Sequence, residues 1–297
     1  HDSMGNDLVR AEEELFLAGD DAARAGAPVE ALELLQESSR LYLARHPGGG
    51  DPAKRVALQK CLAGAYLHRG QMEESTRHFD EALELLGEVN PTTRAGIGLE
   101  LVKTLVPVGL DLYFRGGGAA GRPPATPHDL EVIALMFDRA RTQTTADPAR
   151  FLLQGFATLR KLRRIDPATV PGAGGMYAGT IGIFSYGGLS FNVARRFLAV
   201  ADRYADPANQ AEMFLRRMLA FLHHFLSGDW DDRHEIPLGV VEEAVRRGQL
   251  WDVAHHVGLE AIKHTAQGRW READQRVDWL EGMAQTAGIL VGSVNDF

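Results

Sequence analysis

The stretch that decides the fold runs from Leu62 to Leu85, with the sequence LAGAYLHRGQMEESTRHFDEALEL. Small and apolar residues follow one another at helical spacing on both sides of a turn at Gly70 and Gln71. The first helical face carries Leu62, Ala65 and Tyr66, and the second carries Phe79, Ala82 and Leu83. The stretch therefore predicts two amphipathic helices that pack against each other as a hairpin.

The same arrangement recurs in four further segments, which makes it an internal repeat. They are FLAGDDAARAGAPVEALELL (16–35), GIFSYGGLSFNVARRFLAVA (182–201), HHFLSGDWDDRHEIPLGVVEEAV (223–245) and KHTAQGRWREADQRVDWL (263–280). The last two share Gly-x-Trp, in which the glycine can adopt the left-handed conformation of a turn. We expect Trp230, Trp251 and Trp270 to lie in the core between repeats.

This hairpin pattern resembles the tetratricopeptide repeat (TPR). That family places small residues where two helices touch, and here Ala63 stands where glycine is commoner and Ser75 where alanine is usual. The resemblance implies an all-α fold in which antiparallel helix pairs stack as an α-α superhelix (solenoid). It also implies a scaffold that binds a protein or a peptide.

A second resemblance concerns the segment DPARFLLQGFATLRKL, from Asp147 to Leu162, and the turn with glycine and an aromatic residue that follows. It is similar to the helical array behind the ATPase module in bacterial signal-transduction (STAND-type) regulators fused to kinase or cyclase domains. The spacing of about forty residues between Gly228 and Gly268 suits the longer helices of such arrays. Because no segment matches the ATPase or kinase modules, the resemblance implies a sensor or scaffold region of a larger signalling protein.

Helical periodicity and breaker residues give the expected organisation of the chain. We expect helices at 7–25, 28–46, 52–69, 72–88, 92–114, 128–146, 148–165, 172–187, 190–204, 208–227, 236–247, 249–267 and 270–287. A loop rich in glycine and proline at 115–129 separates N-terminal repeats at 1–114 from C-terminal repeats at 130–297. The two parts are expected to form one continuous array.

Composition narrows the classes of function. The net charge of −8 disfavours nucleic acid as a partner, because phosphate binding needs a positive surface. The sequence contains no apolar run long enough to span a membrane, and its first residues lack the pattern of a signal peptide, so we expect a cytoplasmic protein without membrane contact. The single cysteine, Cys61, cannot form an internal disulfide and is expected to be a buried small side chain.

No pattern of catalysis, cofactor binding or metal binding is found, and the chain is not expected to be an enzyme. The glycine clusters at 116–118 and 172–175 lack the lysine and hydroxyl residues of a phosphate-binding loop. The pairs His223–His224 and His255–His256 are adjacent, so the two rings of each pair point about 100 degrees apart along a helix and do not chelate an ion together. His224 and His264 occupy the tyrosine position of the repeat, which favours a packing role.

The candidate partner-binding residues follow from their position in the repeat. Lys60, His68, Tyr186 and His255 should face the concave groove that first helices line in such an array. The apolar stretch at 289–294 could mediate self-association through the C-terminal end. An alternative from another class is a helical domain that binds or transforms a small molecule in a pocket near 172–186, between the two halves.

Overall fold

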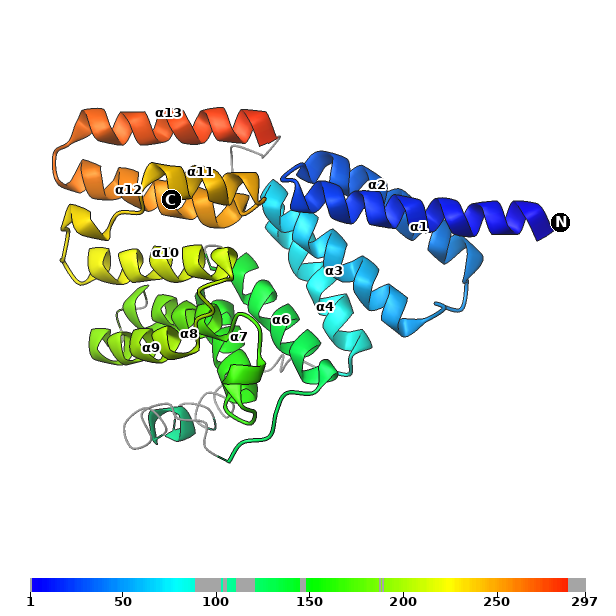
Figure 1. Cartoon of the computed structure of the whole chain (residues 1–297), viewed down its shortest axis with the longest axis horizontal. Helices are drawn as coiled ribbons and strands as arrows, with labels where there is room; N and C mark the ends of the chain where they lie inside the picture. Colours follow the sequence, from blue (N-terminus) through cyan, green and yellow to red (C-terminus); the bar gives the residue numbers. More distant parts are fainter. Residues whose placement is uncertain are drawn as a thin grey trace. The chain divides into compact units, whose positions relative to one another are not determined.

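The computed structural model describes residues 2–88, 103, 106–110, 121–144, 148–186, 188 and 190–287. All regular secondary structure in these ranges is helical, with no strand, and helices adjacent in sequence pack in pairs (Figure 1). The chain forms two compact units. Unit 1 comprises residues 1–88, 242–261 and 270–297, and unit 2 comprises residues 89–241 and 262–269.

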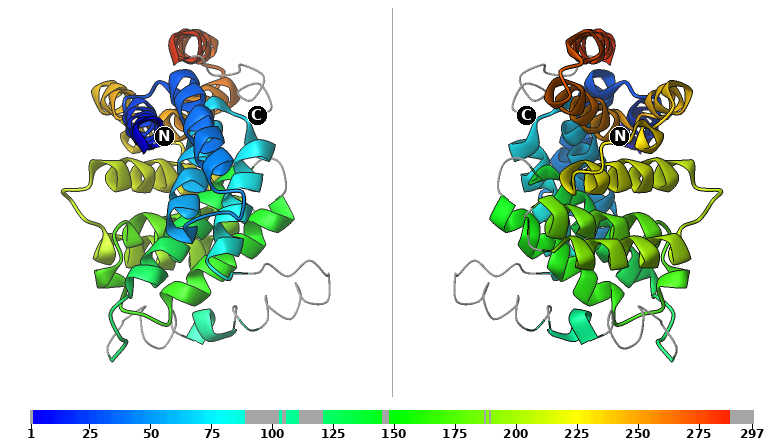
Figure 2. Two further views of the ribbon diagram at one scale, coloured as in Figure 1. Left: turned by 90° about the vertical axis from the view of Figure 1, so that its right-hand side faces the viewer. Right: turned by 90° about the vertical axis from the view of Figure 1, so that its left-hand side faces the viewer.

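Unit 1 begins with two helix pairs, which Figure 2 shows from both sides. They are α1 (Asp2–Arg24) with α2 (Pro28–Arg45), and α3 (Pro52–Arg69) with α4 (Met72–Leu85). The unit also contains α13 (Trp270–Ala287), most of α12 (Leu250–Ala266) and the second half of α11 (Leu238–Arg246). Its helices therefore come from both ends of the chain.

The α3–α4 pair forms because its ends are capped and its contact face is lined with small residues. The Asp51 carboxylate accepts a hydrogen bond from the Ala53 amide at 3.0 Å, and Pro52 occupies the first helical position. At the other end Gly70 has a φ of 81°, which only glycine adopts readily. Ser75, fully buried, donates a hydrogen bond from its hydroxyl to the Ala63 carbonyl at 2.7 Å. The two residues that depart from the repeat pattern thus contact each other across the helix pair.

Within unit 1 the turn after α1 lies against the turn after α11. A side chain on Gly248 would place its Cβ 3.0 Å from the Ala23 carbonyl oxygen, and one on Gly26 would place it 3.4 Å from the Gly248 Cα. Both glycines also have positive φ angles, of 76° and 75°. The backbone conformation requires glycine at both positions, and at Gly248 the close approach of the turn after α1 requires it as well.

Unit 2 is built mainly from the helices in the middle of the chain. They are α6 (Pro127–Thr142), α7 (Pro148–Leu162), α8 (Ala173–Ile181), α9 (Phe191–Tyr204) and α10 (Gln210–Leu226), with 3₁₀ turns η1 (Pro167–Thr169) and η3 (Asp232–His234) and a π-helical turn η2 (Gly182–Tyr186). Helix α8 packs closely through its glycines: a Cβ on Gly179 would lie 2.8 Å from the Phe137 ring.

The expected helices agree with the structure to within a few residues wherever the structure describes them. The expected helix 92–114 lies outside the described residues, apart from residues 103 and 106–110. Within the expected loop, residues 121–126 are irregular or in a turn, whereas α6 begins at Pro127, because Thr126 and Asp129 form a capping box around its first turn. The segment 172–187 begins as a regular helix and then widens into the π-helical turn.

Among the described residues, no helix combines the length and the apolar character needed to cross a lipid bilayer.

The tryptophans correct one expectation. Trp251 is buried, as expected, but Trp230 and Trp270 are 38% and 63% exposed and do not lie in a core between repeats. Each lies two residues after a left-handed glycine that ends a helix, and Trp270 begins the next helix, α13. The Trp230 indole covers the end of its own helix α10, because it stacks on Phe225 and donates a hydrogen bond to the Phe225 carbonyl at 2.8 Å.

Candidate functional site

The predicted partner-binding residues are spread over several elements. Lys60 is exposed and His68 half-buried, and they lie about two turns apart on α3 in unit 1. His255 is half-buried on α12, where its ring packs edge-on against Trp251 and its Nδ1 lies 3.0 Å from the Trp251 carbonyl. Tyr186 ends η2 in unit 2, and its side chain lies outside the described residues, as does the whole stretch 289–294. Only Lys60 and His68 share an element.

One turn type closes helices throughout the chain and explains where polar groups gather. The glycine amide donates to the carbonyl three residues back, and the next amide donates to the carbonyl five residues before itself, at 2.9–3.0 Å. This is the Schellman motif, in which the residue after the glycine meets the residue one turn before the helix end. It occurs at Gly26, Gly70, Gly87, Gly228, Gly248 and Gly268, all with positive φ.

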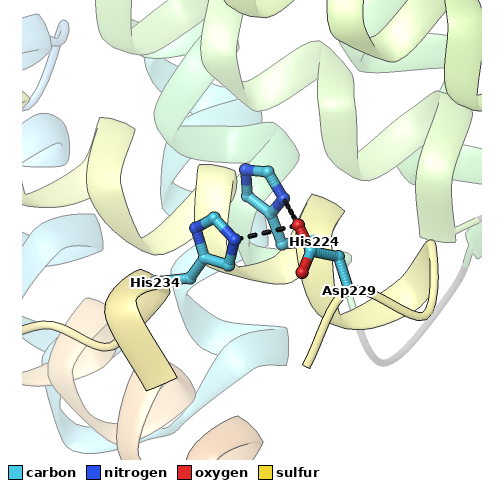
Figure 3. A group of neighbouring side chains, drawn as sticks. All are labelled: His224, Asp229 and His234. Atoms are coloured by element: carbon cyan, nitrogen blue, oxygen red, sulfur yellow. Dashed lines mark hydrogen bonds and ion pairs between the residues drawn. The ribbon is translucent and has the colours of Figure 1, made fainter. Parts of the chain in front are cut away.

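At Gly228 the two residues that this motif brings together are His224 and Asp229. The Asp229 amide donates to the His224 carbonyl at 2.9 Å, and the side chains follow the backbone, with His224 Nδ1 3.0 Å from Asp229 Oδ2. His234, from η3, brings its Nε2 to 2.9 Å from the same oxygen (Figure 3). The two imidazole rings stack in parallel, with centroids 3.6 Å apart. Their side chains are 32%, 42% and 19% exposed for His224, Asp229 and His234.

The connector that carries Asp229 and His234 is held by a second group of charges. Lys263, almost fully buried, donates from Nζ to Asp232 at 2.7 Å and to Glu235 at 2.6 Å. Arg269 makes two further bonds to Asp232, at 2.8 and 3.0 Å. At its base, Asp231 Oδ1 accepts from the Arg233 amide at 2.9 Å and so starts η3. These bonds fix the backbone of the connector independently of the His–Asp–His cluster.

The carboxylates of Asp229 and Asp232 both favour their ionised form. Partial loss of solvent raises the pKa of Asp229, but the hydrogen bonds and charges of His234 and His224 outweigh it and hold that pKa below its usual value. The hydrogen bonds from Arg269 and then from Lys263 hold the pKa of Asp232 well below its usual range. Asp229 is therefore an anion at neutral pH and faces two imidazoles.

Two further side-chain groups contain a nucleophile, namely the Ser185–His223 pair and Cys61. Ser185 Oγ lies 2.9 Å from His223 Nδ1, but the serine is only 2% exposed, so the pair has no access for a substrate. Burial raises the pKa of Cys61 to about 11, with a further contribution from Asp20, so its thiol stays protonated at neutral pH. We interpret both as packing groups.

The sequence pattern did not predict this cluster, because helical spacing relates only residues that lie on one helix. His224, Asp229 and His234 are spaced by five residues and lie across a helix end, a glycine turn and a 3₁₀ turn. The signal was present in the sequence as a glycine turn flanked by His and Asp. His264, the other histidine at the tyrosine position of the repeat, is 3% exposed, which agrees with the packing role expected for it.

Comparison with protein-family models, with curated proteins and with solved structures found no match to the chain.

Proposed function

We propose that the chain is a TPR-like superhelix of antiparallel helix pairs that binds a protein or peptide and serves as the sensor or regulatory region of a larger bacterial signalling protein. The observation that carries the proposal is the repeated Schellman turn, together with helix–helix contacts that are made by small residues. Repeat scaffolds need this combination, because each helix pair must present the same face to its neighbour.

The α3–α4 pair supports the proposal most directly. Its contact face buries Ala63 and Ala82, and Ser75 is bonded across it, so the two backbones approach closely. Lys60, on the same α3 helix, remains exposed. A first helix that packs against its neighbours and still carries an exposed polar side chain suits the grip on an extended peptide.

Peptide binding is tested by selection from a displayed random-peptide library against the full chain, followed by fluorescence anisotropy with the enriched peptides. Lys60→Glu should weaken binding of acidic peptides by at least about tenfold, since it reverses the charge at the proposed contact. Arg271→Glu, an equal charge change at an exposed position of α13, should leave it unchanged. A folded chain that enriches no peptide, or a Lys60→Glu variant with full affinity, contradicts the proposal.

The superhelix is tested separately by small-angle X-ray scattering of the full chain. A compact body of 297 residues has a radius of gyration of about 19 Å. We expect a larger value, because stacked repeats extend along one axis. A measured radius of gyration equal to that of the compact body would exclude an extended array.

A further inference from the structure

We propose that His224, Asp229 and His234 form a binding site for a divalent transition-metal ion of the zinc class, with three protein ligands and at least one position open to solvent. The site lies in unit 2, where α10 ends and the connector to α11 begins (Figure 3). It does not depend on the peptide-binding function.

The ligand set matches this class of ion. Two imidazole nitrogens and one carboxylate oxygen lie within 4.8 Å of one another. Zn²⁺ takes such mixed nitrogen and oxygen sets, whereas Ca²⁺ and Mg²⁺ prefer oxygen ligands alone. Three protein ligands with a solvent molecule in the fourth position is the arrangement of open zinc sites, and the partial exposure of all three side chains leaves room for that molecule.

The distances require only a small adjustment. Tetrahedral zinc with bonds of about 2.0–2.1 Å separates its ligand atoms by about 3.3 Å. The two nitrogens are now 3.0 and 2.9 Å from Asp229 Oδ2, as hydrogen bonds require. An ion would replace the shared protons and move each nitrogen a few tenths of an ångström away from the oxygen. The stacked rings would also tilt out of parallel, because lone pairs in parallel planes do not meet at one point.

The backbone holds the ligands in place before any ion binds. The Schellman turn at Gly228 joins His224 to Asp229, and η3 places His234 on the other side of the carboxylate. Lys263 and Arg269 fix the connector through Asp232 and Glu235, so their positive charges are already balanced by two carboxylates. A preorganised backbone leaves only the tilt of the rings to be adjusted, which lowers the entropy cost of binding, and the Asp229 charge attracts the cation.

The site is tested on the full chain after treatment with a chelator, by calorimetric titration with Zn²⁺ and by absorption spectroscopy with Co²⁺. We expect one tightly bound ion per chain and the intense visible bands of four-coordinate Co²⁺ without a thiolate charge-transfer band. His224→Ala, Asp229→Asn and His234→Ala should each weaken binding by at least about 100-fold. His128→Ala, at an exposed histidine of α6, and Cys61→Ser should leave binding unchanged.

Circular dichroism of each variant separates loss of a ligand from loss of the fold. Folded ligand variants that bind Zn²⁺ like the unchanged chain would overturn the proposal. So would Co²⁺ that keeps its weak octahedral spectrum in the unchanged chain, or Zn²⁺ binding that is lost in His128→Ala or Cys61→Ser.

Discussion

The hairpin closed at Gly70 and the connector closed at Gly228 begin in the same way and end differently. Both use the Schellman turn, and in both the residue one turn before the helix end stacks on a downstream histidine at an interplanar angle of 8°. At Gly70 this pair is Tyr66 and His78; at Gly228 it is His224 and His234. The same backbone turn therefore occurs both in a packed helical hairpin and beside a polar cluster.

The side chains decide what each turn becomes. After Gly70 the next helix starts at Met72, and the stacked pair is bonded to neutral groups: Gln36 donates to the Tyr66 hydroxyl at 2.7 Å and Gln59 meets His78. After Gly228 the chain delays α11 until Leu238, and Asp229 provides a carboxylate to both rings. One aspartate and a longer connector separate a structural turn from a potential ion site.

The largest expected effect is a difference in unfolding free energy between a substitution in the packed hairpin and one in the connector. Phe79 on α4 is 1% exposed. The substitution Phe79→Ala should lower the unfolding free energy by about 3–5 kcal/mol, because removal of the large buried ring leaves a cavity. Trp230→Ala should cost about 1–2 kcal/mol, because Trp230 is 38% exposed and covers only a helix end. Urea denaturation of both variants measures the difference, and equal losses would contradict the contrast between the two regions.

The second prediction concerns the anchor of the connector. Lys263→Ala should lower the unfolding free energy by about 2 kcal/mol, because it removes a buried cation from two carboxylates that remain partly solvated. Arg269→Ala, with a more exposed guanidinium, should cost less than about 1 kcal/mol. Hydrogen exchange should also speed up at 232–235 in Lys263→Ala. Unchanged exchange there would show that the connector is held by other groups.

The third prediction tests whether the two turns share one backbone. Gly70→Ala and Gly228→Ala should each cost about 1–2 kcal/mol, because each glycine has a φ near +80° that an L side chain resists. The matched control is Gly258→Ala, inside α12 with open space around the new Cβ, which should raise stability by about 0.5–1 kcal/mol. Thermal unfolding checks all three. A neutral Gly228→Ala would mean that its turn does not need the left-handed conformation.

The smallest effect is a pH dependence of the hairpin. Burial, with a further contribution from Arg77, lowers the pKa of His78 to about 4. Because the unfolded chain binds this proton near pH 6.5 and the folded chain near 4, stability falls as the pH drops through that window. His78→Gln, which keeps a hydrogen-bonding group, should flatten this part of the profile. An identical slope in both proteins would assign the pH dependence to other groups.

The sequence predicts the helices well and the site poorly, for physical reasons. The ends of a helix depend on residues close to them in the sequence. Pro52 in the first turn and Gly70 after the last turn therefore predict the bounds of α3 without information on its tertiary contacts. The exposure of Trp230 and Trp270 was not predictable in this way, because burial depends on which neighbours pack against a position. The cluster at Gly228 joins residues from three local structures, and helical periodicity relates only residues within one helix.

Unit 1 takes its residues from both ends of the chain, with residues 89–241 of unit 2 between them. During synthesis, helices α1–α4 leave the ribosome long before the partners of the turn at Gly26 exist, since Gly248 lies more than two hundred residues later. Such contacts of high sequence separation form slowly. The intervening segment can thus fold first, and the N-terminal hairpins must wait for the last helices before their unit is complete.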